Sequence, residues 1–349
     1  MIKVLIVDDS QVTRELLKYI LSSDSEIQII GTASNGLEAI EFVEKQLPDV
    51  ITMDINMPKM DGIEAIRKIM SSNPVPIIIV SSSLNPNDVK DSYKAMEAGA
   101  LLIVSKPGGS TTPDYLNMSK NLIDSVKLMS EIKVVKRWSK RNPDNIFVNN
   151  HNKELARDNK EKIKIVVIGV STGGPPVLQT ILSSLPENFS LPILIVQHIS
   201  EGFLPGLVQW LNETSKLKVS IAMKDEIAKP GHVYLAPNKF QMSVDRSGKI
   251  NLTNDKPENS TIPSVSYLFR SVAKEYGSRA MGILLTGMGK DGANELLLMK
   301  ESGAITIAQN KESSTIFGMP GEAVKINAAK YIISPEKIVD ILSSFVDNK

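Results

Sequence analysis

Residues 163–174, IKIVVIGVSTGG, are an apolar run that ends in a glycine-rich turn presenting one serine, Ser171. The residues that follow have the pattern of a helix. A strand, a tight turn and a helix N-terminus suit a nucleophile, because the developing oxyanion can meet free backbone N–H groups. Two further turns, which carry His198 and Asp291, also follow short apolar runs. Open α/β sheets place their sites beyond the carboxyl ends of strands, so the sequence predicts that these three side chains lie together.

The composition limits the class of protein. A chain of 349 residues is about right for two domains. The net charge of +1 excludes a strongly basic nucleic-acid surface over the whole chain, so we expect no nucleic-acid partner. The absence of cysteine excludes disulfides, thiol nucleophiles and cysteine-ligated metals, and only three histidines could supply imidazole.

The hydropathy of the chain favours a cytoplasmic protein. The first apolar run reaches Asp8 and Asp9 within a few residues, which is too short for a signal peptide. No apolar stretch approaches the length of a membrane span. We therefore expect neither secretion nor direct insertion into a membrane.

Apolar runs alternate with helical patterns in the first third of the chain. This alternation predicts an α/β domain with a doubly wound, five-stranded parallel sheet. The expected strands are 2–7, 27–30, 50–53, 77–80 and 101–104.

The pattern dissolves from about Ser130 into a basic, asparagine-rich stretch that cannot bury enough apolar surface to fold alone. We expect a first domain at 1–125, a solvated linker at 126–162 and a second domain at 163–349. Aromatic residues in the linker are limited to Trp138 and Phe147, which argues against a nucleic-acid arm.

Apolar runs alternate with helices again in the second domain, but four successive runs come without helices between them. This pattern predicts an α/β domain with a mostly parallel sheet and an antiparallel excursion. The four runs are 217–222, 232–236, 240–244 and 249–252.

Charged and hydroxyl side chains follow the expected strands of the first domain: Asp8 and Asp9, then Asp54, Ser81 and Lys106. These strand ends meet at one edge of a doubly wound sheet. Clustered carboxylates repel one another, and magnesium is held by a few carboxylates together with waters and phosphate oxygens. The cluster therefore indicates a magnesium and phosphoryl site in which an aspartate can act as nucleophile. The alternative is that they are ordinary loop and capping residues.

Three motifs decide between these interpretations: VDDS at 7–10, MDINMPKMDG at 53–62 and Lys106-Pro107. In this order they closely resemble a response-regulator receiver domain over residues 1–125. The resemblance implies that Asp54 accepts a phosphoryl group from a histidine kinase. It also implies the roles of the neighbouring residues. Asp8, Asp9 and Asp54 hold Mg²⁺, the Ser81 hydroxyl senses the phosphate, and Lys106 contacts the phosphate.

The first domain departs from the receiver pattern at two places. Leu102 and Ile103 stand where the family usually has an acid and an aromatic residue, which puts the usual rotamer switch in doubt but not phosphorylation itself. The serine run after the fourth strand also leaves Ser82 as an alternative to Ser81.

The base and the acid for Ser171 are chosen partly by elimination. His198 follows a strand, whereas His232 opens one and His151 lies in the expected linker, so His198 is the candidate base. A carboxylate that fixes the imidazole could come from Asp291, in a glycine-rich turn, or from Asp225, which also follows a strand. Spacing alone leaves both open.

Residues 163 to about 340 resemble the catalytic domain of chemotaxis response-regulator methylesterases, which are protein-glutamate methylesterases that also deamidate glutamine. The matching runs are GVSTGGP at 169–175, Gln197-His198, Ala236-Pro237, Pro263-Ser264-Val265, LTGMGKDG at 285–292 and Gly318-Met319-Pro320. The resemblance implies a triad of Ser171, His198 and Asp291 with no cofactor in this domain, and backbone donors to the oxyanion at Thr172 and Met288. It also implies methyl-accepting chemotaxis receptors as substrates, with phosphorylation of the receiver uncovering the catalytic cleft.

The second domain departs from this family near the expected site. Charged residues that are common in the family are replaced at two places, in the run 260–266, whose last residue is Ser266, and at Asn310. At a third place, Gln241 replaces a histidine. We expect these positions to line the margin of the substrate groove. They also permit an alternative, a phosphorylation-controlled scaffold with a degenerate catalytic domain, whereas a transcription factor is disfavoured because no helix-turn-helix pattern is present.

Overall fold

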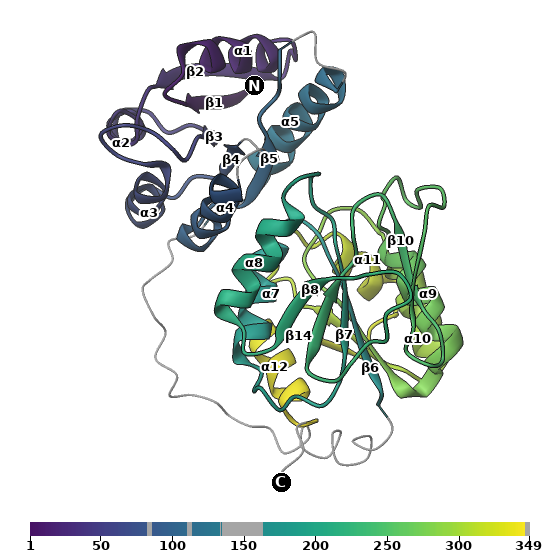
Figure 1. Cartoon of the computed structure of the whole chain (residues 1–349). Coiled ribbons are helices and arrows are strands. Elements are labelled where there is room, and N and C mark those ends of the chain that lie inside the picture. Colours follow the sequence, from purple (N-terminus) through teal and green to yellow (C-terminus); the bar gives the residue numbers. More distant parts are fainter. Residues whose placement is uncertain (82–85, 110–113, 133, 135–162, 346–349) are drawn as a thin grey trace. The chain divides into compact units, whose positions relative to one another are not determined.

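The computed structural model describes residues 1–81, 86–109, 114–132, 134 and 163–345 (Figure 1). The chain divides into two compact units, Met1–Asp144 and Asn145–Lys349. Most of the expected linker, residue 133 and 135–162, lies outside the described residues, and its first residues belong to a helix that extends to Ser130. Among the helices that the structure describes, none combines the length and apolar character needed to cross a membrane.

The first unit is a five-stranded parallel sheet in the order β2-β1-β3-β4-β5, which confirms the predicted doubly wound fold. Helices α1 and α5 pack together, and α3 packs against both α2 and α4. The strands are β1 (Ile2–Val7), β2 (Ile27–Ala33), β3 (Val50–Met53), β4 (Ile77–Ser81) and β5 (Leu102–Ser105), and the helices are α1 (Gln11–Ser22), α2 (Gly36–Lys45), α3 (Gly62–Ser72), α4 (Pro86–Ala98) and α5 (Tyr115–Ser130).

Local sequence explains these elements. Every residue of β3 and β4 is buried, which is why the central strands appear in the sequence as unbroken apolar runs. Helix α1 begins after Ser10, whose hydroxyl accepts a hydrogen bond from Thr13 N at 3.3 Å, and it buries Leu17, Ile20 and Leu21 against the sheet.

The second unit is a seven-stranded sheet in the order β14-β13-β12-β6-β7-β9-β8, parallel throughout. Figure 1 shows α7, α8 and α12 on one side of this sheet and α9, α10 and α11 on the other. The strands are β6 (Ile165–Val170), β7 (Ile193–Gln197), β8 (Lys218–Ile221), β9 (His232–Leu235), β12 (Ala280–Leu284), β13 (Ile305–Gln309) and β14 (Tyr331–Ile333). The helices are α7 (Gly174–Ser184), α8 (Leu204–Thr214), α9 (Val265–Tyr276), η1 (Gly277–Arg279), α10 (Ala293–Glu301), α11 (Met319–Lys325) and α12 (Pro335–Ser343).

The predicted antiparallel excursion is the hairpin of β10 (Gln241–Val244) and β11 (Ile250–Thr253), a separate two-stranded sheet that packs against α9. The other two runs without an intervening helix, β8 and β9, are neighbours in the parallel sheet. The predicted parallel sheet and antiparallel excursion are therefore confirmed, although only two of the four runs, β10 and β11, form the antiparallel part.

The strand order fixes where a site can form. Strand β6 lies between β12 and β7, so the chain leaves it toward one side of the sheet and returns on the other. Such a switch point opens a crevice at the carboxyl ends of the strands. The turns after β6, β7 and β12 carry Ser171, His198 and Asp291 to this edge.

Candidate active site and phosphoryl site

Ser171 occupies the turn between β6 and α7. Gly173 adopts a φ of 76° just before the helix, and a Cβ there would lie 2.3 Å from Thr315 Oγ1, so only glycine fits this turn. A Cβ on Gly287, in the turn after β12, would lie 2.7 Å from Ser171 Cβ. The two glycines thus allow the backbone to close tightly around a half-buried serine.

Gln197 connects the serine turn to the histidine turn. Val170 and Gln197 are partners at the ends of β6 and β7, so Ser171 and His198 are the first residues after two adjacent strands. The Gln197 Nε2 donates to Ser171 O at 3.0 Å and to His198 O at 2.8 Å. This carboxamide is 3% exposed, and it holds the backbones of the two residues together. Sequence reasoning missed this role.

His198 contacts Asp291 directly, with Nε2 and Oδ2 2.9 Å apart. The carboxylate also accepts hydrogen bonds from five donors in residues 259–266. These donors are Asn259 Nδ2 (2.9 Å), Thr261 Oγ1 (3.3 Å), Ser264 Oγ (2.8 Å), Val265 N (2.7 Å) and Ser266 N (3.1 Å). The two backbone donors belong to the first turn of α9, where free N–H groups favour an anion.

These contacts set the charge of Asp291. Burial alone would raise the pKa of its carboxyl, but His198, Ser264 and Val265 N hold that pKa well below the usual range. An ionised Asp291 can only accept, so the imidazole donates from Nε2 and its neutral form keeps Nδ1 as the proton acceptor. No hydrogen bond joins the Ser171 hydroxyl to the imidazole among the described residues. Such bonds are often long until substrate binds.

The proposed oxyanion donors flank Ser171. Thr172 follows it directly, and Met288 follows Gly287, whose backbone closes against the serine. Within the described ranges, neither amide donates to a protein acceptor. Met288 is 58% exposed, so its side chain faces solvent beside the turn.

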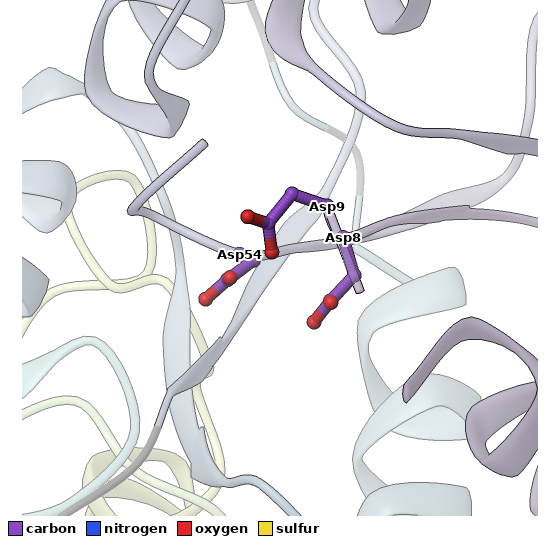
Figure 2. A group of neighbouring side chains, drawn as sticks. All are labelled: Asp8, Asp9 and Asp54. Atoms are coloured by element: carbon purple, nitrogen blue, oxygen red, sulfur yellow. The ribbon is translucent and has the colours of Figure 1, made fainter. Parts of the chain in front are cut away.

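The second cluster lies at the carboxyl edge of the first unit's sheet. Ligand oxygens of Asp8, Asp9 and Asp54 lie within 4.8 Å of one another (Figure 2). Lys106 Nζ lies 2.8 Å from Asp8 Oδ2 and 3.3 Å from Asp54 Oδ2. Ser81 is buried at the end of β4, and its carbonyl accepts a hydrogen bond from Lys106 N at 2.8 Å. The alternative hydroxyl, Ser82, lies outside the described residues.

The charges of this cluster are unbalanced. Burial raises the pKa of Asp54 from 3.8 to about 6, Asp8 adds to the rise, and Lys106 opposes it. Among the residues that the structure describes, three carboxylates face one ammonium group, which leaves an excess of negative charge. The oxygen-only donor set and its spacing fit a hard divalent cation such as Mg²⁺.

Two family models match this chain. Residues 166–342 match the family model "CheB methylesterase", and residues 4–112 match "Response regulator receiver domain". The chain belongs to the CheB methylesterase family. It is 51% identical over 344 residues to the "Protein-glutamate methylesterase/protein-glutamine glutaminase 1" of Syntrophus aciditrophicus, covering 98% of this chain and 97% of the relative.

Two further matches support the assignment. A Nitrosospira multiformis protein with the name "Protein-glutamate methylesterase/protein-glutamine glutaminase" is 50% identical, over 99% of this chain and 97% of its own length. The crystal structure of the Thermotoga maritima CheB methylesterase catalytic domain superposes with a TM-score of 0.51 at 39% identity. It covers 53% of this chain and 99% of the Thermotoga chain. The predicted family is therefore confirmed.

Other candidates in this CheB-family chain lie elsewhere. Asp225 pairs with Lys249 at 2.7 Å on an exposed loop, and its side chain is 55% exposed. His232 begins β9, and its Nδ1 lies 3.1 Å from Pro230 O. His151 lies outside the described residues.

Two of the departures from the CheB pattern, Gln241 and Ser266, are buried, so neither lines the surface of a groove as we expected. Gln241 and Ser266 are 0% and 2% exposed. Gln241 Oε1 accepts from Ser264 N at 2.8 Å, and Ser266 Oγ accepts from Gly292 N at 3.0 Å, so both support the segment behind Asp291. Asn310 stabilises the turn after β13, where its Oδ1 accepts from Ser313 Oγ at 2.5 Å. The sequence motifs predicted that Gln241 and Ser266 lie near the site, but they carry no information about whether these side chains are buried.

Proposed function

We propose that this chain is a phosphorylation-regulated protein-glutamate methylesterase that acts on methyl-accepting chemotaxis receptors. The contact between His198 and Asp291, beside the turn that presents Ser171, carries the proposal. It supplies a nucleophile, a base and an ionised group that stabilises the charged base.

The proposed reaction follows from the proton positions. Ser171 Oγ attacks the ester carbonyl carbon of a methylated glutamate while His198 Nδ1 takes the hydroxyl proton. The amides of Thr172 and Met288 stabilise the oxyanion. The tetrahedral intermediate then expels methoxide, which takes the proton from His198 and leaves as methanol.

Water completes the cycle. His198 removes a proton from water, the hydroxide attacks the acyl carbon on Ser171, and the serine regains its proton as glutamate leaves. A glutamine side chain presents an equivalent carbonyl, with ammonia as the leaving group. We therefore include deamidation, as the names of the relatives indicate for those proteins.

The receiver unit supplies the proposed control. Asp54 accepts the phosphoryl group of a histidine kinase, with Lys106 contacting the phosphate and Ser81 sensing it. Asp8, Asp9 and Asp54 would hold Mg²⁺, which offsets the charge of the transferred group. Phosphorylation then raises esterase turnover in the second unit.

Methanol release from methylated receptor tests the catalytic part. The Ser171→Ala variant should lose about 10,000-fold or more of the rate, whereas Ser183→Ala, which removes an exposed hydroxyl on α7, should match the unsubstituted protein. Activity retained by Ser171→Ala would contradict the assignment. An inactive unsubstituted protein would favour the scaffold alternative.

Acetyl phosphate tests the control. It should raise methanol release by the unsubstituted chain and leave Asp54→Asn unchanged. Equal stimulation of both proteins would contradict regulation through Asp54.

A further inference from the structure

The segment 258–266, here called the strap, provides five of the six hydrogen bonds that Asp291 accepts from the described residues. Its backbone is strained, because Asn259 and Ser260 have φ values of 50° and 64°. Left-handed conformations at residues other than glycine are unfavourable and persist only when the surroundings hold them. The strap therefore depends on contacts at its ends.

An ion network holds the outer end of the strap. Both oxygens of the Glu258 carboxylate accept from Arg270 on α9, at 3.0 and 2.6 Å. This two-bond fork is the ion-pair geometry that most strongly fixes orientation. Arg270 also approaches Glu295 Oε1 on α10 at 3.4 Å.

The same network reaches the inner end of the strap. Ser266 Oγ donates to Glu295 Oε2 at 2.5 Å and accepts from Gly292 N at 3.0 Å. Gly292 follows Asp291 directly, and Glu295 lies in the first turn of the next helix. Both ends of the strap are thus tied to the backbone that carries the carboxylate.

Exposure increases from the catalytic carboxylate outward. Side-chain exposure is 4% for Asp291, 18% for Glu295, 30% for Glu258 and 47% for Arg270. A chain of contacts therefore connects a solvent-facing guanidinium with the buried group that orients His198.

We propose that Glu258, Arg270, Glu295 and Ser266 are positioning residues for the His198–Asp291 pair. This inference rests on the proposed methylesterase function. In the described structure, none of the four forms a hydrogen bond or ion pair with the imidazole. They keep the donors of the strap aimed at Asp291, and loss of the network lets the carboxylate turn away from His198.

The test replaces Arg270 with methionine in the full-length chain. The matched control is Lys274→Met, which removes an 81% exposed charge one turn further along α9, where the lysine pairs with Glu275. We expect Arg270→Met to lower kcat for methanol release about tenfold with KM unchanged, because small displacements of catalytic groups reduce turnover. Arg270→Lys should recover part of the loss, since it restores the charge without the fork.

Nuclear magnetic resonance provides a readout independent of substrate. The chain has three histidines, so the His198 imidazole N–H proton can be assigned after isotope labelling. We expect the resonance hydrogen-bonded to Asp291 to exchange faster with solvent in Arg270→Met and to be unchanged in Lys274→Met. A variant that had merely lost stability would keep the native exchange rate in its folded fraction.

The outcomes separate the two proposals. A native kcat and native imidazole exchange in Arg270→Met would overturn the positioning role. If the unsubstituted protein released no methanol, the proposed function would fail while the exchange measurement still decided the role of the network. If Arg270→Met fails to fold, Glu258→Gln removes the same fork while keeping side-chain size, and the same two readouts apply.

Discussion

Two buried aspartates, one in each unit, have opposite properties. Asp54 is 9% exposed and Asp291 is 3% exposed, and both lie at the carboxyl edge of a parallel sheet. Burial raises the pKa of Asp54 to about 6, whereas the pKa of Asp291 is held well below its usual value of 3.8.

The difference lies in the donors. In the described part of the chain, six donors form hydrogen bonds with the two oxygens of Asp291, so its charge is compensated within the protein. Asp54 shares one ammonium, that of Lys106, with Asp8. Burial alone therefore does not decide the state of a carboxylate. Asp54, in the proposed cation and phosphoryl site, has few donors to compensate its charge, whereas Asp291, the proposed partner of the imidazole, has many.

The largest expected effect is on Asp291→Asn. The asparagine amide carries no negative charge to stabilise the imidazolium, and its NH₂ group cannot accept hydrogen bonds from the donors that surround this position. Methanol release should therefore fall about 10,000-fold. The free energy of unfolding should fall by about 3 kcal/mol, because buried donors lose their acceptor. Asp225→Asn, at the exposed rival position, should change neither quantity. Equal effects of the two substitutions would remove Asp291 from its role.

The same substitution at Asp54 should act in the opposite direction on stability. Asp54→Asn should abolish phosphorylation, measured by incorporation from acetyl phosphate. It should also raise the stability of the first unit by about 2 kcal/mol at pH 7.5 without divalent ions, because the carboxylate is charged there at a cost that the amide avoids. Hydrogen exchange of the buried β3 and β4 amides measures this change. Faster exchange in Asp54→Asn would contradict the comparison.

The pH dependence of the first unit follows from the same pKa. The pKa of Asp54 is about 6 in the folded state, above its ordinary value of 3.8. As the pH rises, the Asp54 carboxyl therefore loses its proton at a lower pH in the unfolded state than in the folded state. Stability should therefore fall as the pH rises from about 4 to about 7, and Asp54→Asn should lose this contribution.

Magnesium should reverse that loss. Saturation at about 100 times the dissociation constant should stabilise the first unit by about 2.7 kcal/mol at pH 7.5, and by less at pH 5, where protons compete for the carboxylates. Thermal unfolding with Mg²⁺ or with a chelator measures the difference. Stabilisation that is equal at both pH values would contradict binding at this cluster.

A smaller effect should come from Gln197→Met. Methionine fills a similar volume but donates no hydrogen bond, so the backbones of Ser171 and His198 lose their shared donor. We expect kcat to fall about tenfold with KM unchanged. Gln209→Met, on the exposed face of α8, is the control. A raised KM with native kcat would instead indicate a role in substrate binding.

Much of this organisation could be predicted from the sequence. Alternating apolar runs predicted both parallel sheets, and the principle that sites form at strand ends predicted that the turns carrying Ser171, His198 and Asp291 lie at one edge of the sheet. Spacing alone left the choice between Asp225 and Asp291 open, because both follow strands, and only the resemblance to the methylesterase family selected Asp291. The structure distinguishes them by the strap, whose donors precede Asp291 by 25 to 32 residues.

Side-chain burial explains the remaining errors. Gln241 and Ser266 were expected at a groove, since proximity in the motif carries no information about direction. Gln197 was seen only as the neighbour of a histidine, and its bridge depends on the β6–β7 register. The roles of all the site residues stay predictions: Ser171, His198 and Asp291 in catalysis, Thr172 and Met288 at the oxyanion, Asp54, Ser81 and Lys106 at the phosphate, and Asp8, Asp9 and Asp54 as metal ligands.

The central claim is that Ser171, His198 and Asp291 act as one hydrolytic unit. Methanol release by Ser171→Ala, His198→Ala and the double variant tests it most directly. If the residues act together, the double variant should be no slower than either single variant, because each substitution already removes the shared mechanism. Losses that multiply in the double variant, or native activity in either single variant, would contradict the claim.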